Sequence, residues 1–173
     1  MKRICLIFLF IFLILPANAK IITGEVEYNA ESAYQEVFAK QPDTISFDFI
    51  KGHLTDKNAV DNISGLMQGI KHFNGRKGAM FSDGSYGIVY DDEPEYTWFY
   101  KSGKLISFTL KSSLDYPAKV TRYKPDGSVT NIGLKVSEEE SFIYSPDGRL
   151  IAHWIGQNCY DGYNRLVMTR KYN

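Results

Sequence analysis

The sequence predicts an α+β protein in which a small helical N-terminal part precedes an antiparallel β-meander of hairpin repeats. Two observations support this prediction. Apolar residues between positions 20 and 76 recur partly at helical spacing, whereas from Lys77 onward short β-like runs are separated by Asp-Gly or Ser-Gly turns. The composition, with 44% hydrophobic and 23% charged residues, is typical of a folded domain rather than of a disordered chain.

Residues 1–19 have the features of a signal peptide. Lys2 and Arg3 precede an apolar run over residues 4–15, which is shorter than the roughly 20 residues that span a bilayer. The small residues around Ala19 suit cleavage directly after it. We therefore expect a secreted or periplasmic protein without a stable membrane anchor, in which residues 20–173 form one domain. An uncleaved N-terminal anchor is the alternative.

Charge and cysteine content narrow the expected partners. The chain has 20 basic and 20 acidic residues, and loss of Lys2 and Arg3 with the leader leaves a small excess of acid. Neither nucleic acid nor another polyanion is therefore indicated as a partner. Cys159 is the only cysteine after the leader, so it cannot close an intramolecular disulfide. We expect its thiol to be buried, with an intermolecular disulfide as the alternative.

Three segments of the mixed part, residues 20–76, have a recognisable period. Residues 30–38 place apolar side chains at helical spacing, with Asn29 as the predicted N-cap. Residues 44–50 alternate polar with apolar side chains, which predicts a strand. Residues 60–70 return to helical spacing, although two glycines weaken the prediction of a helix there.

Four similar segments divide residues 77–173, the predicted hairpin-repeat part. Each has an aromatic residue three or four positions before a turn glycine and an apolar or aromatic residue two positions after it. The turn glycines are Gly84, Gly103, Gly127 and Gly148, which lie 19, 24 and 21 residues apart. This loose period favours one hairpin per repeat.

The turn residues predict specific loops. Pro-Asp-Gly at residues 125–127 and 146–148 predicts three-residue hairpin loops, because proline suits the first turn position and glycine suits the left-handed one. Asp161-Gly162 predicts a fifth turn before a final strand at residues 166–170. Alternation around the loop at 146–148 predicts one buried face, made by Phe142, Tyr144, Leu150, Ala152 and Trp154.

Two of the repeat phrases resemble known hairpin repeats. Tyr-x-x-Asp-Gly-x-Leu, which begins at Tyr144, and Tyr-x-x-Gly-Lys-Leu, which begins at Tyr100, resemble the units of MORN-variant repeat proteins, the family that includes the YwqK-type proteins. They also look like the YD repeats of RHS proteins. The resemblance spans about residues 77–170 and implies an elongated single sheet that is used for contacts rather than for catalysis.

Aromatic side chains are the main indication of a binding surface. Loss of Phe8, Phe10 and Phe12 with the leader leaves 12 Tyr, 8 Phe and 2 Trp, which is more than one thin sheet easily buries. We therefore expect some of them on an exposed face, where Tyr and Trp suit protein hot spots and sugar rings equally well. The candidate binding residues are Trp98, Tyr100, Tyr123, Tyr144, Trp154 and Tyr160. Cross-strand packing without any ligand is the alternative.

Residues for enzyme chemistry are few. A thiol nucleophile needs a base and an orienting group, and His153, Cys159 and Asp161 are the only such set close in sequence. Strand alternation, however, places His153 opposite Trp154 and toward solvent. The sequence contains no CxxC pair, calcium loop or P-loop lysine, so no metal or cofactor is predicted.

The sequence thus favours an exported, non-enzymatic binding protein whose hairpin sheet contacts another envelope protein. An exposed edge of the sheet is one way in which this contact could form. The alternative is a cell-wall or glycan-binding module with aromatic sugar-stacking sites.

Overall fold

The computed structural model describes residues 27–56, 70–73 and 75–170. It confirms the predicted α+β class, because two helices, α1 (Ala30–Phe38) and α2 (Phe47–Lys51), precede an antiparallel meander in which successive strands pair in chain order. The strands are β1 (Lys71–Phe73), β2 (Arg76–Met80), β3 (Ser85–Tyr90), β4 (Tyr96–Lys101), β5 (Lys104–Lys111), β6 (Ala118–Tyr123), β7 (Val129–Lys135), β8 (Glu140–Tyr144), β9 (Leu150–Ile155), β10 (Asn158–Tyr160) and β11 (Leu166–Thr169). The predicted signal peptide and nearly all of the predicted helix over residues 60–70 lie outside the described residues.

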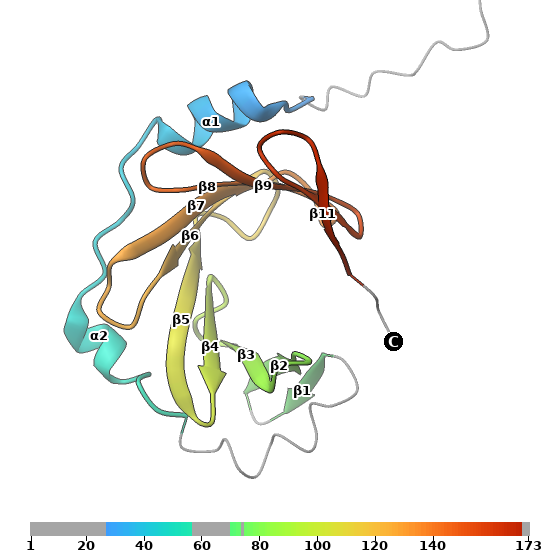
Figure 1. Ribbon diagram of the computed structural model, residues 1–173. Coiled ribbons are helices and arrows are strands. Elements are labelled where there is room, and N and C mark those ends of the chain that lie inside the picture. Colours follow the sequence, from blue (N-terminus) through green and yellow to red (C-terminus); the bar gives the residue numbers. More distant parts are fainter. Residues whose placement is uncertain (1–26, 57–69, 74, 171–173) are drawn as a thin grey trace, which may run out of the picture.

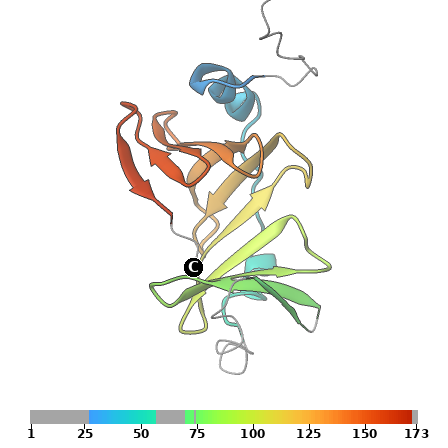
Figure 2. The same ribbon diagram turned by 90° about the vertical axis from the view of Figure 1, so that its right-hand side faces the viewer.

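The sheet curls into an open C, and both helices lie on its outer, convex side (Figure 1). Figure 2 looks into the open side of the C, where the first and last strands stay apart. We call the concave side, which faces away from the helices, the inner face. Strand register and burial below assign each side chain to the outer or the inner face.

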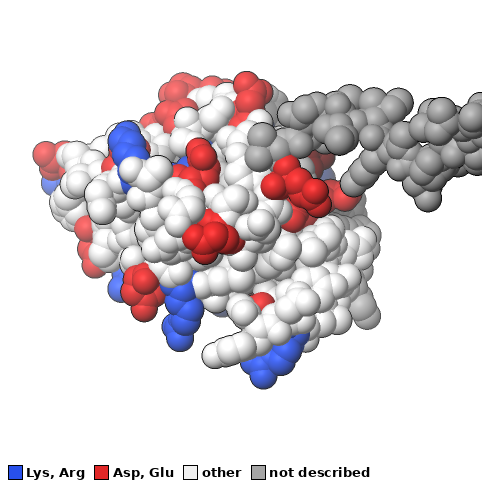
Figure 3. Space-filling model, turned by 90° about the horizontal axis from the view of Figure 1, so that it is seen from above, with Lys and Arg blue, Asp and Glu red and all other residues white. Residues whose placement is uncertain are grey.

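Helix α1 forms where the sequence predicts it. The side chain of Asn29 accepts hydrogen bonds from the backbone N–H groups of Glu31 and Ser32, at 3.0 and 2.9 Å, and Ser32 completes the capping box by accepting from the Asn29 N–H. Ala33 and Val37, which are fully buried, face β7 and β8. Figure 3 looks down on this end of the molecule, where acidic side chains are scattered among uncharged ones.

The predicted strand over residues 44–50 is wrong, because residues 47–51 form helix α2. A strand would point Phe49 and Ile50 to opposite sides, whereas the helical turn lets both pack against the outer face of the sheet. Leu54, four residues after Ile50, reaches the same cluster. Phe47, which the alternating pattern placed inside, is 56% exposed. Tertiary packing therefore overrides the local period here.

The predicted hairpin loops are confirmed. In the β6–β7 and β8–β9 loops, the N–H groups of Lys124 and Ser145 donate to the carbonyls four residues later, at 2.8 and 2.9 Å, which leaves Pro-Asp-Gly as a three-residue loop. The glycines have φ of +83° and +89°, a region that favours glycine. The fifth turn follows the same hydrogen-bond pattern, but Asn164, with φ of +59°, takes the left-handed position instead of Gly162.

The buried face around the β8–β9 loop is only partly as predicted. Phe142 and Tyr144 are buried, but a bulge opposite Ile143 and Tyr144 adds one residue to β9. Because side chains alternate along a strand, the extra residue exchanges the two faces beyond it. His153 therefore stacks on Phe142 on the outer side, with ring centres 4.0 Å apart, while Ala152 and Trp154 face inward. The expected solvent-facing His153 is thus wrong.

Two hydrophobic clusters join the helices to the outer face. Ile50 of α2 packs into the first, which is made mainly by aromatic residues of β3 to β6. Ala33 and Val37 of α1 pack into the second, with apolar residues of β7 and β8. The core therefore lies between the helices and the sheet, and it includes the repeat aromatics Tyr100, Tyr123 and Tyr144.

Candidate binding surface

Four of the six aromatic residues predicted to bind a ligand are buried in the core. Trp98 and Tyr100 are 0% exposed, Tyr123 is 1% exposed and Tyr144 is 2% exposed. These side chains cannot contact a partner while the protein is folded, so their prediction as binding residues is wrong. The packing alternative applies to them instead, because each lies in one of the two clusters on the outer face.

The buried tyrosines attach the N-terminal segment to the sheet through their hydroxyl groups. The Tyr123 hydroxyl donates to the Asp43 carbonyl at 2.9 Å, and the Tyr144 hydroxyl donates to the Ala30 carbonyl at 2.6 Å. Burial raises the pKa of Tyr144 to about 12, so this phenol remains a donor at neutral pH. Both residues therefore combine an apolar core ring with a polar anchor.

Trp98 packs against helix α2 and against His53, which follows the helix. Its ring stacks on His53, with centres 3.8 Å apart and planes within 3° of parallel, and its Nε1 donates to Glu93 at 3.3 Å. Nε2 of His53 lies 3.3 Å from the same Glu93 carboxylate. Since Trp98 is fully buried in this arrangement, the contacts explain why a tryptophan is needed for packing and not for ligand binding.

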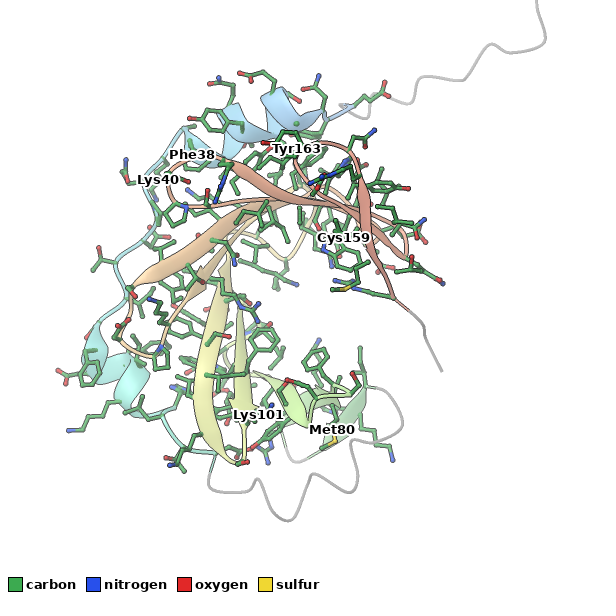
Figure 4. All side chains as sticks on the ribbon, viewed as in Figure 1. Phe38, Lys40, Met80, Lys101, Cys159 and Tyr163 are labelled. Atoms are coloured by element: carbon green, nitrogen blue, oxygen red, sulfur yellow. The ribbon has the colours of Figure 1, made fainter. Side chains whose placement is uncertain are left out.

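The other two predicted residues, Trp154 and Tyr160, lie partly exposed beside the last hairpin. Tyr160 pairs with Leu166 of β11, and Trp154 lies under the guanidinium of Arg170, 3.7 Å from its ring centre. Figure 4 labels Tyr163, which lies in the β10–β11 turn and is 85% exposed. We call the following set the terminal edge surface: Trp154, Tyr160, Tyr163, Leu166, Val167 and Met168.

Strand β11 exposes apolar side chains on both of its sides. Leu166, Val167 and Met168 are each 57% exposed, and among the described strands β11 pairs only with β10. Most edge strands avoid this arrangement by carrying charges or proline. At the opposite edge of the sheet, β1 does carry Lys71 and His72. The two edges therefore differ, and only β11 combines an apolar strand with an open side.

Comparison of the chain with known protein families, curated proteins and solved structures finds no match. The resemblance to MORN-variant and YD repeats therefore stays a prediction.

One sequence signal points to the terminal edge surface. Leu166, Val167 and Met168 are apolar at successive positions, which places apolar side chains on both sides of a strand instead of one. The sequence predicted the strand, but it did not predict that the side chains on both sides of this strand would be exposed.

The possible catalytic set of His153, Cys159 and Asp161 is not assembled. His153 pairs with Tyr160, the neighbour of Cys159, so the imidazole and the thiol point to opposite faces of the sheet. Burial raises the pKa of Cys159, which disfavours the reactive thiolate. Asp161 is engaged by Arg165 within its turn, at 2.6 Å, and that hydrogen bond lowers its pKa. Cys159 is buried, at 5% exposure, as the sequence predicts, and the alternative of an intermolecular disulfide stays a prediction.

A pocket of about 360 Å³ lies between the linker that joins the helices and the two Pro-Asp-Gly loops. Its charged lining residues, Lys40 and Asp43, pair with each other at 3.4 Å. Within residues 27–56, 70–73 and 75–170, no three His, Cys, Asp or Glu side chains are placed to hold a metal. No helix of this part of the chain is long and apolar enough to cross a membrane. The terminal edge surface is therefore the better candidate for binding.

Proposed function

We propose that this protein is an exported binding protein that docks another envelope protein through its terminal edge surface. The observation that carries the proposal is β11, whose apolar side chains are exposed on both sides and whose outer edge is open among the described strands. An open edge offers unpaired backbone groups, to which an extended segment of a partner can add as a further strand. The partner's backbone would supply affinity, and its side chains would supply specificity.

The neighbouring side chains support a protein partner. Tyr160 pairs with Leu166, Tyr163 lies in the turn before β11, and Trp154 contacts Arg170 just after it; Tyr and Trp are residue types enriched in interface hot spots. Arg165 and Arg170, which flank β11, are held by Asp161 and by the Trp154 ring. The charges next to the strand are thus already engaged and do not obstruct a pairing strand.

The alternative of aromatic sugar stacking has weaker support. That function needs several exposed rings, but four of its six candidate rings are core residues. Only Trp154 and Tyr160 keep some exposure, and the face of Trp154 is shared with Arg170. The remaining rings fit the rim of a protein interface better than a set of sugar subsites.

The test is a crosslinking pull-down from cell envelopes with residues 20–173 as bait, in the native form and as Val167→Lys. Charge at the centre of β11 opposes strand addition, so we expect recovery of the specific partner to fall at least tenfold. The matched control is Leu114→Lys, which adds the same charge at another exposed apolar residue, 61% exposed and outside the strands.

Strand addition also has a direct signature. In the complex with the recovered partner, backbone amides of residues 166–169 should exchange with deuterium more slowly than in the unbound protein, because they become hydrogen-bonded. Equal recovery with Val167→Lys and native bait would contradict the proposal, as would unchanged exchange of the β11 amides in the complex.

A further inference from the structure

The inner face gathers basic side chains from several strands. Lys135 pairs with Ala118 of β6, and Lys111 pairs with Val120 of β6. Ala118, Val120 and Arg122 are every second residue of this strand, so their side chains lie on the same side of it. The three cations therefore share one side of the sheet. It is the inner side, because Tyr123, the residue after Arg122, points to the outer core. Lys77 joins them from β2, since its partner Val89 points opposite to the buried outer residue Ile88.

The curvature of the sheet brings these charges within electrostatic reach of one another. The pKa of Lys111 is lowered, first by burial and then by the charges of Lys135 and Lys77, which come from strands on both sides of it. Glu95 lies next to Lys111, since its carbonyl accepts the Lys111 N–H at 3.0 Å, and Asp91, which follows β3, is held by His72 at 2.9 Å. No ion pair in the described part of the chain joins a carboxylate to any of the four cations.

Arg122 is the most deeply placed of the four. Its guanidinium lies 4.5 Å from the centre of the Phe99 ring, and its Nε is buried without a hydrogen-bond partner among the described residues. Burial alone lowers its pKa. An arginine held on an aromatic ring is positioned in advance for an anion, because little side-chain entropy remains to be lost.

We propose that the inner face binds an extended anionic glycan whose acidic groups pair with the four basic side chains. Neighbouring strands lie about 4.8 Å apart, so cations on β2, β5, β6 and β7 form a broad array that suits a chain of charges better than a single phosphate. The row that contains Arg122 also holds short hydroxyl and amide side chains: Thr97, Thr109 and Asn131. These groups suit the hydroxyls of sugars.

An acidic peptide fits the inner face less well. An extended peptide must satisfy its own backbone N–H and C=O groups, and it usually does so at a sheet edge. The middle of a sheet face offers no backbone groups for this purpose, because its strands already pair with one another. A glycan has no such requirement and can use side chains alone. The overall charge of the chain hides this site because acidic residues elsewhere balance it.

The experiment measures binding of residues 20–173 to four polymers by calorimetry: heparin oligosaccharides, polygalacturonate, neutral dextran and polyglutamate. We expect the sulfated and the carboxylated glycan to bind, with affinity that falls as salt rises, and dextran not to bind. The double variant Lys111→Gln/Lys135→Gln should bind at least tenfold more weakly. Both side chains are partly exposed, so the fold should persist, which thermal unfolding checks.

The control is Lys51→Gln, which removes an exposed lysine of α2 on the outer side and should leave glycan binding unchanged. No binding of either anionic glycan, equal binding of dextran, or tighter binding of polyglutamate would each overturn the proposal. So would an equal loss in the control. Val167→Lys should bind the glycans normally, which separates this site from the terminal edge surface.

Discussion

At the scale of single residues, the repeat aromatics have a structural role that their position before each turn does not reveal. Tyr123 and Tyr144 stand at the end of a strand, fill the core with their rings and donate their hydroxyls to the N-terminal segment. Each repeat motif of this kind therefore specifies a hairpin and, at the same time, a point where the segment before the sheet is held.

Removal of one such hydroxyl should cost stability without damage to the core. In Tyr144→Phe the ring stays buried, but the 2.6 Å hydrogen bond to the Ala30 carbonyl is lost. We expect the free energy of unfolding to fall by about 1 kcal/mol, as measured by urea denaturation. Tyr163→Phe is the matched control, because that side chain is 85% exposed, and its unfolding curve should overlay the native one. Equal stability of both variants would contradict the anchoring role.

The composition indicated exposed aromatics, but it could not say which ones. Trp98 and Trp154 both follow β-like sequence patterns, yet one is fully buried and the other is partly exposed. The difference arises from the bulge in β9, which reverses the side of the sheet that Trp154 faces. A single added residue of this kind leaves no clear trace in an alternating pattern.

At the scale of elements, the Asp-Gly turns are stabilised by hydrogen bonds to their aspartate side chains as well as by their backbone conformation. The aspartates of the Asp-Gly turns accept hydrogen bonds inside their own loops. For Asp83, bonds from the Ser85 hydroxyl and N–H lower the pKa from 3.8 to about 2. Ser128 lowers the pKa of Asp126 in the same way.

These shifts predict how stability responds to acid. A carboxylate with a lowered pKa in the folded state stabilises the fold above its ordinary pKa, and this contribution disappears as the pH falls from about 4 to 2. Denaturant midpoints measured across that range should fall less steeply for Asp83→Asn than for the native protein. Asp92→Asn, which removes an exposed carboxylate outside the Asp-Gly turns, should keep the native slope. Identical slopes for all three proteins would refute the prediction.

Two turn glycines allow the effect of backbone strain to be separated from that of contact with the Tyr34 ring. Gly84 and Gly148 both have positive φ, +79° and +89°. A Cβ at Gly84 would meet nothing within 4 Å, but at Gly148 it would lie 2.9 Å from the Tyr34 ring of α1. Gly84→Ala should cost about 1 kcal/mol from strain alone, and Gly148→Ala should cost more because the Tyr34 ring must also shift. Thermal unfolding of both variants tests this, and equal losses would show that the contact between the loop and the Tyr34 ring does not contribute to stability.

Helix α1 and the hairpins were predictable because each has a strong local signal: a capping residue, a helical period or a turn glycine. Helix α2 was not, since its five residues match the alternation of a strand. What decides between them is the space beside β4 and β5, where Ile50 fills the core. No local pattern reports that space.

At the scale of the whole molecule, the strand order could be anticipated, but the curvature could not. Short turns impose neighbour pairing, and pairing in chain order leaves two edges. Whether the sheet closes depends on twist and bulges at particular pairs, such as those at Phe99 and Arg122. The inner face results from this open curvature, and its basic residues come from β2, β5, β6 and β7, so they do not appear as neighbours in the sequence.

The strand order also bears on how the chain assembles as it is synthesised. Each hairpin closes between adjacent segments, so the sheet can grow one strand at a time with little loop entropy to overcome. The first helix, by contrast, is hydrogen-bonded through Ala30 to Tyr144, which lies 114 residues later in the sequence. Helix α1 can therefore dock only after β8 has been synthesised, so most of the open C can form before the outer layer that completes its core.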